Sequence, residues 1–164
     1  MARARAVWVV MAIVIGFLGV PGAADAPPSR DEVLRFVRAY IDANNSADPI
    51  AVMDMVSKKP EVSTAEMGVI NRGWEAIRAE ADKLAGAQGS HTISLGTMDV
   101  AFLGPGYALV VAPVTIDLSV GGNQTQIHAA MTLVLEKSSG KWKVLHEHDS
   151  LQFPLGDFPG AAAN

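Results

Sequence analysis

The chain has 164 residues, a formal net charge of −4 and no cysteine. This length favours a single domain, and the lack of cysteine excludes disulfides and lipid attachment through a lipobox cysteine. No cluster of Lys or Arg follows the N-terminus, and nucleic-acid binding depends on such clusters. The sequence therefore predicts no nucleic-acid partner.

The N-terminus has the pattern of a secretory signal peptide. Arg3 and Arg5 precede an apolar run over residues 6–20, and Ala24-Asp25-Ala26 fits a cleavage site. The run is shorter than the roughly 20 residues that span a membrane. We therefore predict a signal peptide over 1–26, a domain over 27–153 and a flexible tail over 154–164. The protein would be exported to the periplasm or beyond, with no membrane contact after cleavage; retention of 1–26 as an anchor is the alternative.

Helical patterns dominate the first half of the domain. Asp31 is expected to cap a helix that ends near Asn44-Asn45, and Asp48-Pro49 to start a second one. Residues 61–72 suggest a short strand or a hairpin around Gly68. A third helix is expected after Gly73. The inward-facing residues of the second and third helices would be Ile50, Met53, Val56, Trp74, Ile77, Ala81 and Leu84.

From Ser90 onward the apolar period changes from helical to alternating. Strands are expected over 91–103 and 107–120, followed by a long hairpin over 125–153 that turns at Ser139-Gly140. Helices followed by a strand meander predict an α+β fold, with three N-terminal helices packed on the concave face of a curved antiparallel sheet.

The register of the last hairpin determines which side chains face the helices. Pairing Lys137 with Trp142 places Leu135 opposite Val144 and Glu136 opposite Lys143. The inward pairs would then continue as Leu133–His146, Met131–His148 and Ala129–Ser150. This face begins apolar at Trp142 and turns polar at the two histidines, as a pocket wall would. Glu147 and Asp149 are expected on the outer face with Lys143.

Three segments together carry a family resemblance. They are residues 40–44 with Asp48-Pro49 (YIDAN…DP), residues 71–78 (NRGWEAIR) and residues 140–150 (GKWKVLHEHDS). Their order and spacing resemble the SnoaL-like branch of the nuclear-transport-factor-2-like superfamily, over nearly all of the predicted domain. The resemblance implies a cone-shaped fold that often dimerises through its outer sheet face. It implies no single activity, because this fold hosts isomerases, cyclases, dehydratases and binders without catalysis.

The ketosteroid isomerases of this superfamily allow a comparison by residue. Tyr40 matches their tyrosine oxyanion donor on the first helix. Their aspartate base corresponds to Thr64, with Glu66 nearby at a different place in the pattern, and their second donor is a protonated acid on a late strand. The matching inward row here has no acid: Ile127, Ala129, Met131, Leu133 and Leu135. The resemblance therefore implies one of the three catalytic parts.

Three functions remain open from the sequence. The first is a homodimeric binder of a small, mostly apolar molecule without catalysis, and the second is an isomerase, cyclase or dehydratase with His146 or His148 as base and Tyr40 as oxyanion donor. The third is an interaction module whose cavity is filled. No metal or cofactor is expected, because the histidine pair lacks a third ligand. The expected ligand-lining residues are Trp74, Met98, Val114, Ile116 and Met131.

Overall fold

The computed structural model describes residues 29–85 and 89–152. The predicted signal peptide and tail lie outside these residues. Within them, no helix combines the length and the hydropathy that crossing a membrane requires. The helices are α1 (Arg30–Asn45), α2 (Pro49–Met55) and α3 (Trp74–Ala85).

The strands form one curved sheet. In chain order they are β1 (Ser63–Glu66), β2 (Val69–Arg72), β3 (Ser90–Leu95), β4 (Asp99–Gly104), β5 (Tyr107–Val120), β6 (Asn123–Ser138) and β7 (Lys141–Leu151). The order in the sheet is β2-β1-β7-β6-β5-β3, with β4 also paired to β5. Every pair is antiparallel except β1 with β7. The sheet is therefore mixed, and the predicted α+β class with helices against a curved sheet is confirmed.

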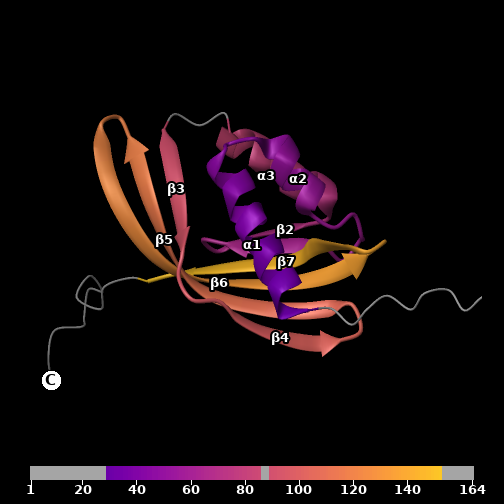
Figure 1. Cartoon of the computed structure of the whole chain (residues 1–164). Coiled ribbons are helices and arrows are strands. Elements are labelled where there is room, and N and C mark those ends of the chain that lie inside the picture. The colour runs from indigo at the N-terminus through magenta and orange to yellow at the C-terminus, as the bar shows by residue number, and fades with distance from the viewer. Residues whose placement is uncertain (1–28, 86–88, 153–164) are drawn as a thin grey trace, which may run out of the picture.

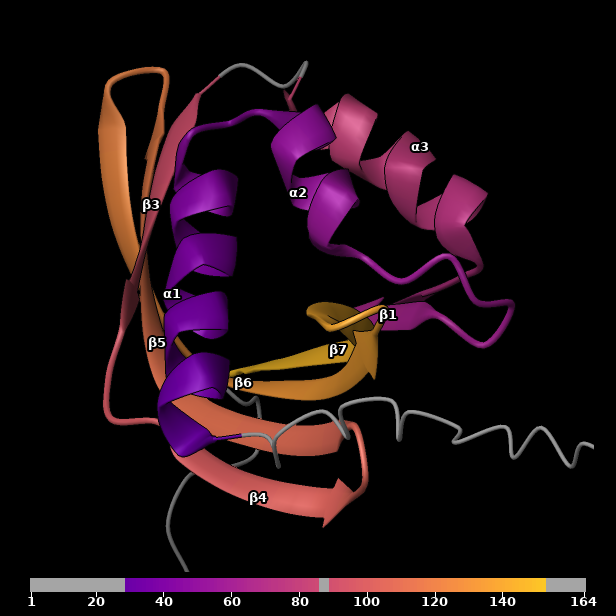
Figure 2. The same ribbon diagram turned by 45° about the vertical axis from the view of Figure 1, so that its right-hand side comes forward.

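The helices cover the concave side of this sheet (Figure 1). In the turned view, α1 runs beside β3, while α2 and α3 lie toward β1 (Figure 2). The long strands β5 and β6 alternate buried and more exposed residues, so one face of each faces the helices. The core consists of fully buried side chains from both layers, among them Val33, Val37, Met53, Val110, Leu133, Leu135 and Val144.

Local capping explains where the first two helices begin. Asp48 caps α2 as predicted, because its carboxylate accepts hydrogen bonds from the N–H groups of Ile50 (2.9 Å) and Ala51 (3.3 Å). The predicted cap of α1 at Asp31 is wrong. Ser29 holds that place, and its hydroxyl accepts from the N–H of Glu32 at 3.2 Å.

Two helix residues predicted to face the core are exposed instead. Ile50 is 60% exposed in the first turn of α2, and Leu84 is 58% exposed near the end of α3. Met53, about one turn after Ile50 in α2, and Ile77, about two turns before Leu84 in α3, are buried as expected. Met53 is the buried residue of α2 and Ile77 that of α3, so the periodic pattern overestimates how much of each helix is buried.

The strand predicted over 91–103 is interrupted. Residues 96–98 separate β3 from β4, although both strands pair with the same edge of β5. Gly96 lies so close to β5 that its N–H donates to the carbonyl of Pro113 at 2.8 Å. A Cβ at this position would lie 2.7 Å from the Pro113 ring, which only glycine avoids.

The register predicted for the last hairpin is correct only near its turn. Lys137 pairs with Trp142 and Leu135 with Val144, but the next β6 residue, Val134, pairs with His146. Leu145 is thus an extra residue, a β-bulge that reverses the side-chain alternation beyond it. The predicted pairs Leu133–His146, Met131–His148 and Ala129–Ser150 are therefore wrong. Leu133 lies opposite Glu147, Met131 opposite Asp149 and Ala129 opposite Leu151.

Candidate functional site

Three carboxylates lie together on the concave face of the sheet, and the bulge in β7 turns two of them there. Glu147 and Asp149 lie opposite the buried residues Leu133 and Met131. The parallel strand β1 places Glu66 opposite Asp149. One oxygen from each carboxylate lies within 4.8 Å of the other two. We call Glu66, Glu147 and Asp149 the acidic cluster.

Tyr40 reaches this cluster from the buried stripe of α1. Its hydroxyl donates a hydrogen bond to Oε2 of Glu147 at 2.6 Å, and both residues are buried. The ring stacks on Phe36 with centroids 6.5 Å apart, one turn earlier on the same helix. Helix packing therefore fixes the position of the hydroxyl before any molecule binds.

Burial and mutual repulsion make the cluster hold protons. Burial first, and then the charges of Glu66 and Asp149, raise the pKa of Glu147 to about 8, while the bond from Tyr40 opposes this shift. Burial and the charges of Asp149 and Glu80 raise the pKa of Glu66 to about 7. Burial raises the pKa of Asp149 to about 6, against the charge of His148. The three groups share their protons as one coupled system near neutral pH.

The Tyr40 hydroxyl stays protonated across this range. Burial, the charge of Glu147 and its hydrogen bond to Glu147 raise the pKa of Tyr40 well above its ordinary value. The pair Tyr40–Glu147 thus presents O–H donors inside the fold at neutral pH.

A pocket of about 350 Å³ opens next to the cluster. It is lined by Met67, Gly68, Asp149, Ser150 and Leu151. Gly68 has φ +81 and turns the chain between β1 and β2, which places the exposed Met67 at the rim. We call this the acid pocket. Asp149 alone of the cluster lines it, and its Oδ1 is buried without a hydrogen-bond partner among the described residues.

His146 and His148, the predicted bases, lie on the other face of the sheet. Nδ1 of His146 is 2.9 Å from the hydroxyl of Ser63, and His148 is exposed. The extra residue Leu145 turns both rings away from the helices and turns Glu147 and Asp149 toward them. The predicted outer position of Glu147 and Asp149 is therefore wrong. The histidine-based mechanism required both rings to face the helices, and they face away from them.

Of the five residues predicted to line a ligand, Met98 lines a pocket other than the acid pocket, and the other four line neither of the two. Met131 is buried opposite Asp149, and Val114 is buried opposite Ala129. Ile116 lies further along β5 and is half-buried, and Met98 lines a different pocket. The indole of Trp74 donates to the carbonyl of Met53 at 3.4 Å, under the ammonium of Lys58. Their role in ligand binding stays a prediction.

Carboxylate oxygens at this spacing are the ligand type that Mg²⁺ and Ca²⁺ take in proteins. Both ions need six or more oxygens, and one of the three carboxylates already accepts the Tyr40 hydroxyl. The arrangement is better suited to exchanging protons than to enclosing an ion.

Each residue of the acidic cluster was named from the sequence, but the three were not placed together. Glu66 follows Thr64 by two positions, and residues two apart on a strand share a face. Thr64 and Glu66 therefore point the same way, toward Glu147 and Asp149. That spacing was the available signal for Glu66. The bulge that completes the cluster has no comparable signal in the sequence.

Comparison with known proteins defines the class. The model of the SnoaL-like domain matches residues 33–155, which is most of the chain, so the chain belongs to the SnoaL-like family. No curated protein sequence matches it.

Solved structures agree on the fold. A nuclear transport factor 2-like superfamily protein from Salmonella enterica superposes with TM-score 0.69 at 19% identity, covering 79% of this chain and 95% of that one. A nuclear transport factor 2-like protein of unknown function from Pseudomonas putida gives 0.66 at 17% identity, covering 79% and 92%. A candidate scytalone dehydratase from Novosphingobium aromaticivorans gives 0.68 at 10% identity, covering 75% and 83%. At these identities the likeness shows the fold alone.

Proposed function

We propose that this protein catalyses proton transfer on a small, mostly apolar carbonyl compound bound in the acid pocket. The observation that carries the proposal is the acidic cluster: three carboxyl groups with raised pKa values, joined to Tyr40, with one member at a pocket. A carboxyl group whose pKa lies near neutrality exchanges protons most effectively at physiological pH.

Asp149 is the catalytic residue in this proposal. It lines the pocket, and a pKa of about 6 leaves it mostly ionised at neutral pH, so it can accept a proton from a carbon next to a carbonyl group. Glu66, with a pKa of about 7, is protonated half the time; it lies opposite Asp149 and outside the pocket lining, so it exchanges protons with Asp149 rather than with the bound compound.

Glu147 and Tyr40 are positioning residues. Neither lines the pocket, and both are buried behind Asp149. Glu147 is mostly protonated at neutral pH, because burial and the charges of Glu66 and Asp149 raise its pKa to about 8. Tyr40 fixes the Glu147 carboxyl by its 2.6 Å hydrogen bond.

The pocket walls indicate the substrate class. Met67 and Leu151 supply apolar contact, while Asp149 and Ser150 supply polar groups. A volume of about 350 Å³ lies near the lower limit of small-molecule sites. This composition favours a compact apolar body with one or two oxygen atoms. The likeness to a candidate scytalone dehydratase is compatible with such chemistry.

Deuterium exchange tests the proposal without knowledge of the natural substrate. A panel of small cyclic and aromatic ketones and β-hydroxy ketones is incubated with the protein in D₂O, and proton NMR follows deuterium entering next to the carbonyl, or loss of water. We expect catalysed exchange for some members, with a rate that rises as Asp149 ionises around pH 6.

Two variants on β7 distinguish a base in the acidic cluster from a histidine base. Asp149→Asn is expected to lower the exchange rate at least a hundredfold, as removal of a general base does. His148→Gln, on the opposite face, is expected to leave the rate unchanged at high pH, where Asp149 is fully ionised, and to shift only the pH at which Asp149 ionises. Loss of exchange in His148→Gln with retention in Asp149→Asn would refute the proposal, and so would no exchange above buffer across the panel.

We also propose that the protein is exported and that it forms a homodimer through the outer face of the sheet. The N-terminal pattern supports export, and exposed apolar residues on the outer face, such as Tyr107 (37%) and Val111 (39%), support self-association.

A further inference from the structure

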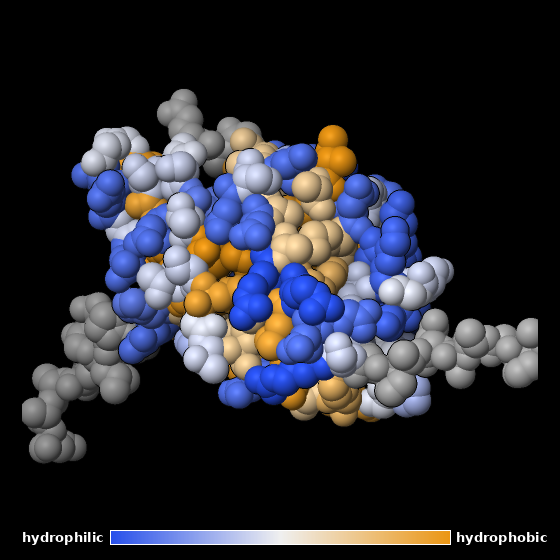
Figure 3. Space-filling view, in the orientation of Figure 1, coloured by the Kyte–Doolittle hydropathy of each residue, from blue (hydrophilic) through white to orange (hydrophobic). Residues whose placement is uncertain are grey.

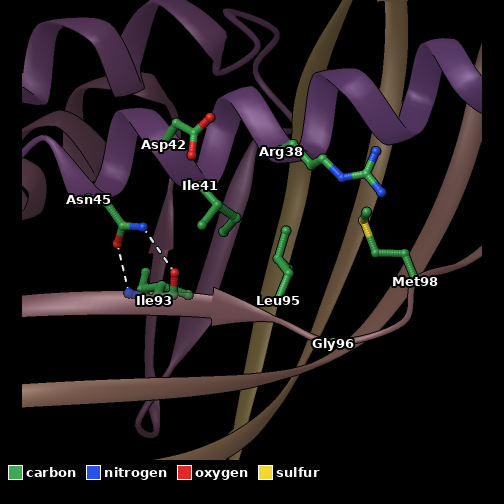
Figure 4. A pocket seen from close by; sticks show the side chains of 8 residues that line it. All are labelled: Arg38, Ile41, Asp42, Asn45, Ile93, Leu95, Gly96 and Met98. Atoms are coloured by element: carbon green, nitrogen blue, oxygen red, sulfur yellow. Dashed lines mark hydrogen bonds between the residues drawn. The ribbon is translucent and has the colours of Figure 1, made fainter.

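A second pocket lies on the flank of the fold, between α1 and the free edge of β3. Its volume is about 310 Å³. It is lined by Arg38, Ile41, Asp42 and Asn45 from α1 and by Ile93, Leu95, Gly96 and Met98 from the facing chain (Figure 4). We call it the flank pocket. None of its residues lines the acid pocket.

The walls of the flank pocket are fixed by hydrogen bonds between α1 and β3. The Asn45 side chain donates to the carbonyl of Ile93 at 2.9 Å and accepts from its N–H at 2.7 Å, as a neighbouring strand would (Figure 4). At the other end, the Arg30 guanidinium donates to the carbonyl of Met98 at 2.9 Å. The two sides are therefore held apart at a set distance, and the pocket does not depend on ligand binding to form.

The floor of the pocket is apolar. Ile41 and Met98 are almost fully buried, and Ile93 and Leu95 are half-buried beside them. The space-filling view shows hydrophobic side chains exposed between β3 and α1, next to strongly hydrophilic ones over α1 (Figure 3). An apolar ligand body placed here would cover this surface from water.

Positive charge gathers at the Met98 end. The guanidinium of Arg38 lies beside the Met98 side chain (Figure 4), and Arg30 contacts the Met98 carbonyl. No carboxylate of the described residues lies within ion-pair distance of Arg38. Asp42, the one acidic residue of the lining, lies one helical turn away beside Asn45. Charge thus differs between the two ends of the pocket.

We propose that the flank pocket binds a small organic monocarboxylate with an apolar body. The carboxylate pairs with Arg38 at the Met98 end, and the body lies on Ile41, Ile93 and Leu95. The guanidinium fork matches a carboxylate in shape and charge. The reverse orientation would bring the carboxylate toward Asp42, which repels it. This site is separate from the proposed catalytic pocket and does not rest on the function proposed there.

Three probes of equal chain length test the charge preference. Hexanoate, hexylamine and hexanol are titrated into the full chain, and methyl ¹H–¹³C NMR follows the signals of Ile93, Leu95 and Met98. We expect hexanoate to shift these signals and to bind at least tenfold more tightly than the other two, because only hexanoate pairs with Arg38. Equal affinity for the three probes, or shifts confined to residues around the acid pocket, would overturn the proposal.

Two arginines on the same helix provide matched variants. Arg38→Gln removes the charge and retains length, and we expect about tenfold weaker hexanoate binding. Arg35→Gln removes an equally exposed charge outside the pocket lining and is expected to change affinity less than twofold. Both positions are exposed, so neither change disturbs the core. An equal loss in both variants would mean general charge attraction and would refute the site.

Discussion

Two glutamates are buried among the residues that the structure describes, and their surroundings differ. Glu136 is 3% exposed on the face of β6 opposite to Leu135, and it forms an ion pair with Lys59 and accepts a hydrogen bond from Ser57. Glu147 is 9% exposed on the concave face, and it meets Tyr40 and two further carboxyl groups. A buried carboxylate with a cation beside it is a structural anchor. A buried carboxyl among other acids takes up a proton instead, which makes it available for chemistry.

The segment between α2 and β1 produces this difference. After Met55 the chain passes Val144, where Val56 bridges to β7, and Ser57 and Lys59 then reach Glu136 and Tyr107. The same segment continues into β1, which brings Glu66 to the concave face. One connection therefore supplies a cation to one glutamate and a second acid to the other.

The largest expected effect is a fall in stability with rising pH, caused by the acidic cluster. The folded state holds the Glu147 proton up to about pH 8, whereas an unfolded glutamate loses it near 4.5. The folded state therefore binds more protons in this window, and the free energy of unfolding falls as pH rises through it. Glu66 and Asp149 contribute with the same sign.

Glu147→Gln should remove its share of this fall, about 3 kcal/mol between pH 5 and pH 8. Gln cannot ionise and can still accept from Tyr40. Urea unfolding at several pH values measures the slope, and Glu61→Gln, at an exposed position, is the control. If the slope of Glu147→Gln equals that of the wild type, Glu147 does not hold the proton.

The second prediction concerns Glu136 and tests its ion pair with Lys59. Lys59→Met leaves the Glu136 carboxylate buried with Ser57 as its remaining partner, and we expect the free energy of unfolding to fall. The loss is moderate because Lys59 is partly exposed, so water screens the pair.

A double variant shows whether the unpaired charge causes that loss. Lys59→Met with Glu136→Gln removes both charges, and urea unfolding should show at least half of the stability restored. A double variant as unstable as Lys59→Met alone would mean that the lysine stem, rather than its charge, holds the segment.

Most of the fold was predictable because its signals are local. Asp48-Pro49 starts α2, Ser139-Gly140 turns the last hairpin, and alternation over 107–120 gives β5 with its predicted bounds. Each signal needs a few neighbouring residues and no knowledge of distant contacts. Tyr40 was also predictable, since it lies on the apolar stripe of α1.

The partners of Tyr40 were not predictable, because they depend on one extra residue. Val134 and Leu145 are both apolar, so pairing them satisfies the pattern as well as the bulge does. Beyond the bulge, histidines and acids alternate along β7. Whichever of the two sets faces the helices, that face of the strand is polar, so polarity does not decide between the registers. The choice is made by tertiary structure: β1 pairs with β7 in parallel, and α1 presents a hydroxyl donor to Glu147.

The smallest expected effect concerns that hydroxyl. Tyr40→Phe retains the ring that stacks on Phe36 and removes the donor to Glu147, which should cost about 1 kcal/mol at pH 5. The Tyr40 bond lowers the pKa of Glu147, so its removal should raise that pKa further. Carboxyl ¹³C NMR titration measures this shift directly. A lower Glu147 pKa in Tyr40→Phe would show that the hydroxyl does not act as a donor to the carboxylate. A higher pKa in an otherwise folded variant would show that Tyr40 sets the pH range in which the acidic cluster releases protons. Glu136 is paired with a cation instead and lies outside this cluster.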